Sequence, residues 1–293
     1  MKKRVLAMVL ATAMAATMFA GCGEKKEEAP AASSAASEAA EEAASEEAEE
    51  TEEATEETAE ATDAAIDHIV FATNPEFPPF EFITPDGVMG EYDGIDMAIA
   101  AKIGENTGIN VEMQSMEFDS LLVALQNGQI DATIAGMTVT DERAKSVDFT
   151  TPYYTATQVM IVKEDSDIAS AADMEGKKIT VVQGYTGETV VQDLGYKPNE
   201  NYEAFKKGTE CIMELLNGKC DVVVIDSATA QKYVADNKGL KIVEDEEAFG
   251  AEEYAMAVQK GNTALLNLLN EQIEAMLADG TISELSAKYI DEQ

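Results

Sequence analysis

Residues 130–143, IDATIAGMTVTDER, contain the pattern that decides the fold. Residues 130–135 are a strand candidate, and Gly136 begins a turn of small residues where backbone can approach a ligand. Thr140 and Asp141 can cap a following helix that carries Arg143. The stretch therefore predicts a strand, a turn and a helix in succession, as in an α/β protein.

The same alternation continues on both sides of this stretch. Short β-rich runs are separated by amphipathic segments, which predicts an α/β fold with a mainly parallel sheet. The predicted strands are residues 68–72, 110–114, 130–135, 178–182 and 221–225. Apolar residues at helical spacing predict helices around residues 95–103 and 121–125, the second of which stops before Gly128.

The later part of the chain predicts a second lobe. A new series of strands and helices starts near residues 153–159 and continues to about residue 247. A strand-like stretch at 254–258 precedes a long helix at 262–277 and a short one at 282–289. If these helices return to cover the first sheet, two chain crossings form a hinge, with a cleft where strand ends and helix N-termini meet.

Arg143 stands out because it is the only arginine after Arg4. A guanidinium stays charged and can donate two parallel hydrogen bonds, which suits a carboxylate better than an ammonium does. The alternative is a structural ion pair with Asp141 or Asp148. Composition alone leaves both interpretations open.

Several segments together resemble a known family. Residues 136–143 (GMTVTDER) and 147–154 (VDFTTPYY) resemble the amino-acid-binding branch of the type 2 periplasmic binding proteins, also called solute-binding protein family 3. Further matching segments, in the family's order, are 72–80 (ATNPEFPPF), 90–96 (GEYDGID), 118–126 (FDSLLVALQ), 182–187 (VQGYTG), 217–226 (NGKCDVVVID) and 278–280 (ADG). The resemblance covers residues 67–291. It implies a two-lobed α/β fold with two hinge crossings and an interlobe ligand cleft.

Carried over to this sequence, the resemblance implies a site for a free amino acid. Arg143 and the hydroxyl of Thr138 would hold the α-carboxylate, assisted by Thr186 at a helix N-terminus of the second lobe. Asp226 would bind the α-ammonium together with the carbonyl of Gly136. Asp226 could also, or instead, cap the helix that follows it. Because each lobe supplies one charge, binding would favour closure.

The resemblance also implies the walls of the site. Phe77 and Phe118 correspond to aromatic residues that sandwich the ligand side chain, whereas Phe80 is expected in the core. Asn74 lies where relatives often carry an acid that contacts the ligand's distal group. Polar neutral and basic amino acids therefore both remain candidates. Tyr185 is expected either to cover the pocket or to face solvent.

The first 65 residues predict an anchor and a tether. Residues 1–22 combine three cations, an apolar run and a final Cys22, and resemble a bacterial lipoprotein signal peptide whose cysteine carries the lipid. The alternative is an uncleaved membrane helix. Residues 23–65 hold 16 acidic residues against two lysines and have no apolar face, which predicts a disordered tether.

These features predict the domain organisation and the location. Lobe 1 is expected at residues 66–155 and 253–293, with lobe 2 at 156–252. The chain is expected on the extracytoplasmic face of the bacterial cell membrane, held by its lipid. Its formal net charge of −37 and lack of a basic stripe argue against nucleic acid as a partner.

The sequence offers little for catalysis. The single histidine, His68, begins the first predicted strand and is expected at the surface. Cys211 and Cys220 are expected to be buried thiols, with a disulfide as the alternative, and their spacing is not that of a metal site. No metal or other cofactor is expected. Dehydratases share the fold that the resemblance implies, so an acid such as Glu76 or Asp226 acting alone stays an alternative.

The function expected from the whole sequence is therefore binding. We expect the substrate-binding component of an ABC importer, monomeric and not an enzyme, which captures a polar or basic L-amino acid. It would present the ligand to a membrane permease and its ATPase. The alternatives are an extracellular sensor or adhesin on the same scaffold, or a dehydratase-like enzyme.

Overall fold

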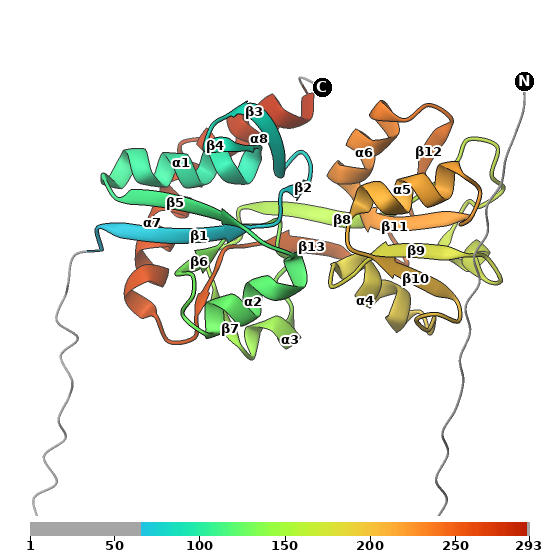
Figure 1. Ribbon diagram of the computed structural model, residues 1–293, viewed down its shortest axis with the longest axis horizontal. Helices are drawn as coiled ribbons and strands as arrows, with labels where there is room; N and C mark the ends of the chain where they lie inside the picture. Colours follow the sequence, from blue (N-terminus) through green and yellow to red (C-terminus); the bar gives the residue numbers. More distant parts are fainter. Residues whose placement is uncertain (1–65, 292–293) are drawn as a thin grey trace, which may run out of the picture. The chain divides into compact units, whose positions relative to one another are not determined.

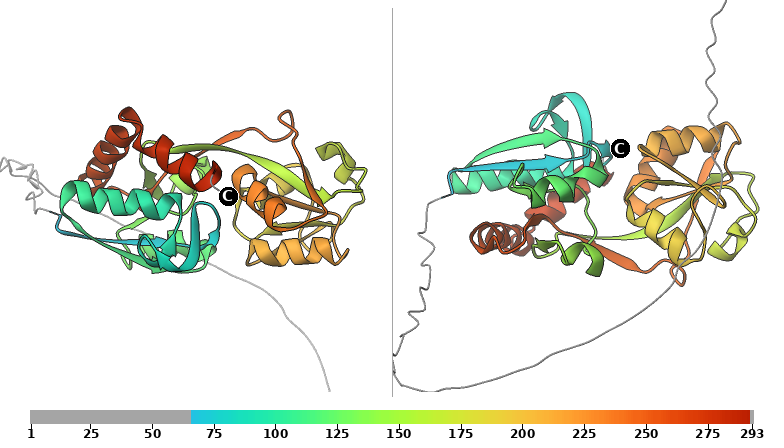
Figure 2. Two further views of the ribbon diagram at one scale, coloured as in Figure 1. Left: turned by 90° about the horizontal axis from the view of Figure 1, so that it is seen from above. Right: turned by 60° about the horizontal axis from the view of Figure 1, so that its bottom comes forward.

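The computed structural model describes residues 66–291, which form two α/β lobes joined by extended strands (Figure 1). The predicted signal peptide, with Cys22, and the predicted tether lie outside the described residues. The two lobes can also be told apart in the two further views of Figure 2.

The first lobe contains a five-stranded sheet in the order β5-β1-β6-β14-β7. Its strands are β1 (His68–Thr73), β5 (Asn110–Ser115), β6 (Ala132–Thr133), β7 (Val147–Phe149) and β14 (Ala257–Gln259). Its helices are α1 (Ile95–Thr107), α2 (Phe118–Gln126), α3 (Asp141–Ala144), α7 (Thr263–Ala278) and α8 (Thr281–Asp291). A small antiparallel sheet of β2 (Glu76–Phe77), β3 (Glu81–Gly87) and β4 (Gly90–Asp93) belongs to the same lobe.

Helices α1 and α2 lie on opposite faces of this sheet (Figure 1). The alternation of side chains along β1 explains the arrangement. Ile69 and Phe71 pack in the same core as α1, whereas Ala72 packs with Leu121 and Leu125 of α2. Both faces of the strand are therefore apolar, as a buried strand requires.

The second lobe contains a sheet in the order β10-β9-β11-β8-β12, with β13 also paired to β8. Its strands are β8 (Tyr154–Lys163), β9 (Ile179–Val182), β10 (Tyr202–Phe205), β11 (Val222–Asp226), β12 (Leu240–Val243) and β13 (Ala251–Tyr254). Its helices are α4 (Thr186–Asp193), α5 (Gly208–Leu216), α6 (Ser227–Asp236) and the 3₁₀ turn η1 (Ala171–Met174). Alternate β11 residues again divide between two cores: Val223 packs with α5, and Val224 with α4.

The chain crosses between the sheets along β8 and again after β13, which pairs antiparallel with the start of β8. The predicted strand at 254–258 is therefore wrong as a single element. Tyr254 ends β13 in the second sheet, whereas Ala257 begins β14 in the first. The sequence pattern predicted one apolar strand here because both halves of the stretch are buried.

The expectation of mainly parallel sheets is also wrong. Strands β1, β5 and β6 pair in parallel, as do β9, β10 and β11, but β14, β7, β8, β12 and β13 pair antiparallel. Each of these antiparallel pairs contains β8 or β14, which are the strands in and after the crossings. The predicted strand cores at 68–72, 110–114, 178–182 and 221–225 are confirmed to within a residue or two.

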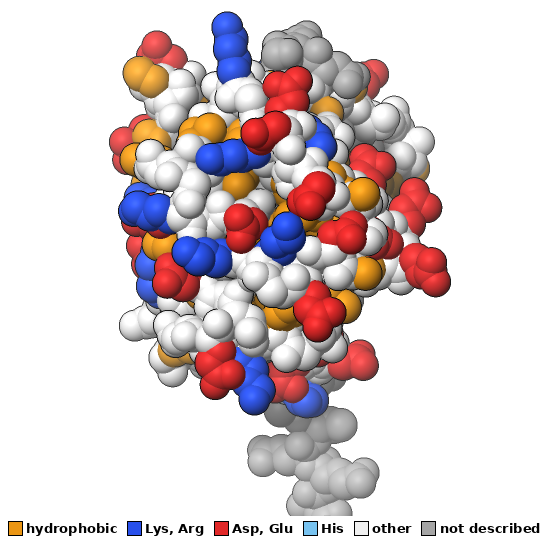
Figure 3. All heavy atoms as spheres, turned by 90° about the vertical axis from the view of Figure 1, so that its right-hand side faces the viewer, with side chains coloured by type: hydrophobic (Ala, Val, Ile, Leu, Met, Phe, Trp, Pro, Cys, Tyr) orange, Lys and Arg blue, Asp and Glu red, His pale blue; other side chains and the backbone are white. Residues whose placement is uncertain are grey.

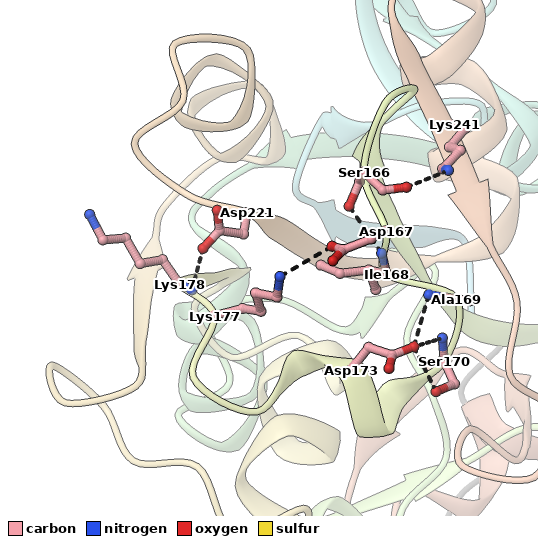
Figure 4. A network of polar contacts seen from close by, with 10 residues as sticks. All are labelled: Ser166, Asp167, Ile168, Ala169, Ser170, Asp173, Lys177, Lys178, Asp221 and Lys241. Atoms are coloured by element: carbon pink, nitrogen blue, oxygen red, sulfur yellow. Dashed lines mark hydrogen bonds and ion pairs between the residues drawn. The ribbon is translucent and has the colours of Figure 1, made fainter.

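The loop from β8 to β9 is held by its own polar contacts (Figure 4). The Asp173 carboxylate accepts hydrogen bonds from the backbone N–H groups of Ala169 and Ser170, both at 3.0 Å. Lys177 pairs with Asp167 at 3.2 Å. These contacts satisfy the N-terminus of η1 and fix the outer end of the second lobe.

Cys211 and Cys220 are both buried free thiols, so the disulfide alternative is wrong. None of the helices between residues 66 and 291 has the length and apolar character needed to cross a bilayer. On the end of the molecule seen in Figure 3, acidic and basic side chains are interspersed.

Candidate functional site

The predicted binding residues converge on one small cavity. Its lining residues are Phe77, Phe118, Ala135, Gly136 and Arg143 from the first lobe and Tyr185, Thr186 and Asp226 from the second. The volume open to a water-sized sphere is about 10 Å³, which is room for about one water molecule. The two lobes are thus closed on each other across the site.

The turn after β6 forms one wall, and only glycine fits there. Gly136 has φ of +51°, and a Cβ at this position would lie 2.6 Å from the ring of Phe77. Its N–H donates to Oδ2 of Asp96 at 2.7 Å. The Asp96 carboxylate therefore fixes the turn that places Gly136 against the aromatic wall.

Arg143 reaches the cavity from the short helix α3. Thr140 caps this helix, as predicted, because its hydroxyl accepts the N–H of Arg143 at 3.2 Å. The guanidinium donates to the carbonyl of Thr138 at 2.7 Å and to that of Gly184, in the other lobe, at 3.0 Å. It also lies 5.3 Å from the centre of the Phe118 ring, in a cation–π contact.

The alternative role for Arg143, an ion pair with Asp141 or Asp148, is not found. Asp148 pairs instead with Lys260 at 2.8 Å. No salt bridge within 4 Å involves Arg143 anywhere in residues 66–291. Burial lowers the pKa of Arg143, and the nearby Asp226 and Glu252 oppose that shift. A half-buried guanidinium without a direct carboxylate partner is suited to receive one from a ligand.

Thr138 and Thr186 link the lobes directly. The hydroxyl of Thr186 donates to that of Thr138 at 2.8 Å, and Thr138 donates onward to the carboxylate of Glu252 at 2.6 Å. Thr186 is the first residue of α4, where backbone N–H groups are free and the helix dipole is positive. The predicted carboxylate ligands are therefore beside one another, next to an electropositive helix end.

Asp226 enters the cavity from the C-terminal end of β11. It occupies the N-cap position of α6, but its side chain makes no capping hydrogen bond, so the capping alternative is wrong. The Tyr254 hydroxyl donates to its Oδ1 at 2.5 Å, and the side chain is buried. Burial raises the pKa of Asp226, and the neighbouring Glu252 raises it further.

Tyr185 is buried, so the expectation that it faces solvent is wrong and the expectation that it covers the pocket stands. Its ring meets that of Phe77 edge-on at 5.3 Å and that of Phe118 at 4.7 Å. Its hydroxyl donates to Oδ1 of Asn74 at 3.0 Å, and Asn74 donates to the carbonyl of Met116. The two aromatic residues predicted to sandwich a ligand side chain thus contact Tyr185. Phe80 is fully buried in the core, as expected.

A set of buried polar residues behind the cavity was not predicted from the sequence. Besides Asp96, they are Glu81, Tyr153, Gln158, Glu252 and Tyr254. Burial raises the pKa of Asp96 to about 7 and that of Glu81 well above its usual range. Glu81 could have been singled out from the sequence, because it lies between Phe80 and Phe82. A carboxylate inside an aromatic run is unusual for core packing alone.

Ion pairs close the rim of the site. Lys206 and Lys207, which precede α5 in the second lobe, pair with Asp119 at 2.5 Å and Glu76 at 2.6 Å in the first. The Tyr233 hydroxyl also donates to the carbonyl of Glu76 at 3.4 Å. Glu76 is thus a rim residue bound to a lysine, which does not suit a general base.

The predicted surface position of His68 is confirmed. His68 is at the surface and lies 3.6 Å from Glu112. Among residues 66–291, no three His, Cys, Asp or Glu side chains gather in a way that could hold a metal ion.

Two α/β lobes that close on a cavity with a guanidinium on one side and a carboxyl on the other define a two-lobed binding protein. The chain belongs to the bacterial extracellular solute-binding proteins, family 3, whose sequence profile matches residues 69–292.

Individual relatives agree with this family. A probable histidine-binding protein of Neisseria gonorrhoeae is 36% identical over 221 residues, covering 74% of this chain and 81% of that protein. The ABC transporter arginine-binding protein 1 of Escherichia coli is 33% identical, covering 77% and 91%. The solved structure of the arginine-, lysine-, histidine-binding protein ArtJ from Geobacillus stearothermophilus superposes with a TM-score of 0.71 at 33% identity, covering 76% of this chain and 95% of that one.

Proposed function

We propose that this protein is the substrate-binding component of an ABC importer and that it captures a free polar or basic L-amino acid. The observation that carries the proposal is the placement of Arg143 and Asp226 on opposite lobes of the same cavity. An α-amino acid is a zwitterion, and each of its charges finds an opposite charge there. Binding both ends draws the lobes together, so the ligand itself favours the closed form.

In this proposal, each predicted residue has a role. Arg143, Thr138 and Thr186 bind the α-carboxylate, while Asp226 and the carbonyl of Gly136 bind the α-ammonium. The ligand side chain lies between Phe77 and Phe118, with Asn74 at its distal end. The ligand side chain therefore displaces the ring of Tyr185 or stacks on it.

The nature of the relatives supports binding rather than catalysis. Proteins that are 33–36% identical to this chain are named histidine- or arginine-binding proteins. The carboxyl of Asp226 is held by Tyr254, and no histidine approaches the cavity. We infer that the protein delivers its ligand, chemically unchanged, to a permease.

The proposal also covers location and boundaries. We place the lobe boundaries near residues 155 and 252, within the β8–β13 crossings. The extracellular location of the family supports a two-lobed region held outside the membrane by lipid on Cys22. We expect this two-lobed region to act as a monomer.

A thermal-shift screen of the twenty common amino acids tests the function. A ligand at about 100 times its Kd should stabilise the fold by about 2.7 kcal/mol, which for this size corresponds to roughly 5–10 °C. Arg143→Ala should abolish the shift for every amino acid. Lys145→Ala is the matched control, because Lys145 lies on the same segment but is exposed and paired with Glu142. If no amino acid shifts the transition of the wild type, the proposal is wrong.

A further inference from the structure

Residues 184–186 of the second lobe contact the groups that are proposed to bind the ligand. The carbonyl of Gly184 accepts a hydrogen bond from the Arg143 guanidinium at 3.0 Å, where the ligand carboxylate would accept one. The hydroxyl of Thr186 donates to that of Thr138 at 2.8 Å. We call residues 184–186 the mimic segment, because in the closed form they make contacts that the proposed function assigns to the ligand.

The side chain of Tyr185, in the middle of this segment, lies where the ligand side chain is proposed to lie. Its ring centre is 5.3 Å from that of Phe77 and 4.7 Å from that of Phe118, the two proposed walls. Its hydroxyl donates to Oδ1 of Asn74 at 3.0 Å, at the proposed distal end. The amide nitrogen of Asn74 donates to the carbonyl of Met116, which leaves Oδ1 to accept from the group that fills the pocket.

The ring spacings leave no room for a ligand side chain between Tyr185 and either wall. Centre-to-centre distances of 4.7 and 5.3 Å are those of rings in direct contact. A group inserted between two rings would need roughly 7 Å, which is two van der Waals contacts of about 3.5 Å each. The cavity beside these rings has room for about one water molecule. The spacing therefore favours displacement of the Tyr185 ring over stacking on it.

Tyr185 is also the aromatic residue of the site that can move without disturbing a lobe. The ring of Phe77 is held within the first lobe, where it stacks on Phe80 at 5.6 Å and lies against Gly136. The ring contacts and the hydroxyl bond of Tyr185 instead cross from the second lobe to the first. Opening of the lobes breaks these contacts together, so the ring can leave the pocket while each lobe stays folded.

We propose that the mimic segment occupies the site of the closed, ligand-free protein, and that an incoming amino acid must displace the Tyr185 ring in order to bind. This inference rests on the proposed function. The ligand carboxylate replaces the Gly184 carbonyl at Arg143, and the ligand side chain replaces the phenol between Phe77 and Phe118. The displaced ring moves to solvent. Because the same contacts are lost whichever amino acid enters, the mimic segment lowers the affinity for every ligand by the same factor.

Tyr185→Phe tests this competition by the direction of its effect. The variant keeps the ring but removes the hydroxyl bond to Asn74, so the ligand has less to displace. Calorimetric titration should give a Kd about twofold to tenfold lower than that of the wild type, which is the fold-change of one lost hydrogen bond. Tyr289→Phe is the matched control, because the hydroxyl of this buried residue donates to Asp93 at 2.5 Å, away from the cavity. Its Kd should equal that of the wild type.

Two ligands and a second variant separate competition from direct contact with the ligand. The ligands are the two amino acids that give the largest thermal shifts. Both should gain by the same factor in Tyr185→Phe, whereas a factor that depends on the ligand side chain would show that Tyr185 contacts it. Tyr185→Ala also removes the ring contacts, so its Kd should lie at least about tenfold below that of the wild type.

Near-UV absorbance shows whether the ring leaves the pocket. The chain contains no tryptophan and nine tyrosines, so this band is dominated by tyrosine. A ligand without an aromatic ring should give, in the wild type and in Tyr289→Phe, the difference spectrum of a tyrosine transferred to water. Tyr185→Phe should lack that component, because a phenylalanine ring does not contribute to it.

The outcomes separate the two proposals. If an amino acid binds the wild type but its Kd is unchanged or higher in Tyr185→Phe, the displacement is wrong while the proposed function stands. Equal difference spectra from the wild type and Tyr185→Phe also overturn it. If Tyr185→Ala does not fold, Tyr185→Phe and the spectra still decide. If no amino acid binds, the proposed function fails, and this inference fails with it.

Discussion

Asp96 is the buried carboxylate that holds the Gly136 turn. Its Oδ2 accepts the N–H of Gly136 at 2.7 Å and the hydroxyl of Tyr153 at 2.9 Å, while Oδ1 has no partner in the described part of the chain. Burial dominates these hydrogen bonds and raises its pKa to about 7. The folded protein therefore keeps a proton that the unfolded chain releases above about pH 4.

This raised pKa predicts a dependence of stability on pH. The contribution is present below pH 4 and is lost as the pH rises through about 7, with a magnitude on the order of 4 kcal/mol. Urea unfolding of the ligand-free protein should show a larger free energy of unfolding at pH 5 than at pH 8. Asp96→Asn should reduce that difference.

The control for this titration is Asp131→Asn. Asp131 also accepts a backbone N–H, that of Val70 at 2.8 Å, but it is exposed. This variant should keep the pH difference of the wild type. A pH difference that is the same in Asp96→Asn as in the wild type would contradict the role given to burial.

Single residues also show how far the sequence predicts the site. Arg143 and Asp226 could be chosen because their chemistry matches a zwitterion and their segments resemble a family. Glu252 could not, because it lies more than 100 residues from Thr138 in sequence and its partners meet only after folding. Tyr185 was left open because its burial depends on contacts with the opposite lobe.

Two lysines next to the start of α5 connect the lobes. Lys206 and Lys207 form ion pairs with Asp119 and Glu76 across the rim, and these pairs exist only while the lobes are closed. Exposed ion pairs are weak and are screened by salt. They therefore adjust the balance between open and closed forms without fixing it.

Removing one pair should weaken binding modestly. Lys207→Ala should raise the Kd by about twofold to fivefold, with the difference from the wild type shrinking at high salt. Lys219→Ala is the matched control, since Lys219 pairs with Glu214 at 2.7 Å inside the second lobe. Titrations at low and high salt measure both. Equal effects of the two substitutions would show that closure is not involved.

The elements also show where sequence patterns stop being informative. Periodicity located the strands within each lobe because they are either apolar on both faces, as β11 is, or alternate apolar and polar residues, as β5 does. It failed at residues 254–258, where two buried strands of different sheets follow each other with only Ala255 and Met256 between them. Periodicity also gives no strand direction, so the reversed directions of β8 and β14 were missed.

For the whole molecule, the closed site has to open before it can bind. A cavity with room for about one water molecule does not admit an amino acid. The contacts that hold it shut are the Tyr185, Thr186 and rim contacts between the lobes. Ligand binding must replace these contacts with stronger ones, and the matched opposite charges of Arg143 and Asp226 supply them.

The most direct test uses the two ends of the ligand separately. Calorimetric titrations would compare the amino acid selected by the thermal-shift screen with its decarboxylated amine and its deaminated acid. If Arg143 binds the carboxylate and Asp226 the ammonium, each analogue should bind at least about 100-fold more weakly. Arg143→Ala should bind the amine no worse than the wild type does. An amine or acid that binds the wild type as tightly as the parent amino acid would contradict the proposed site.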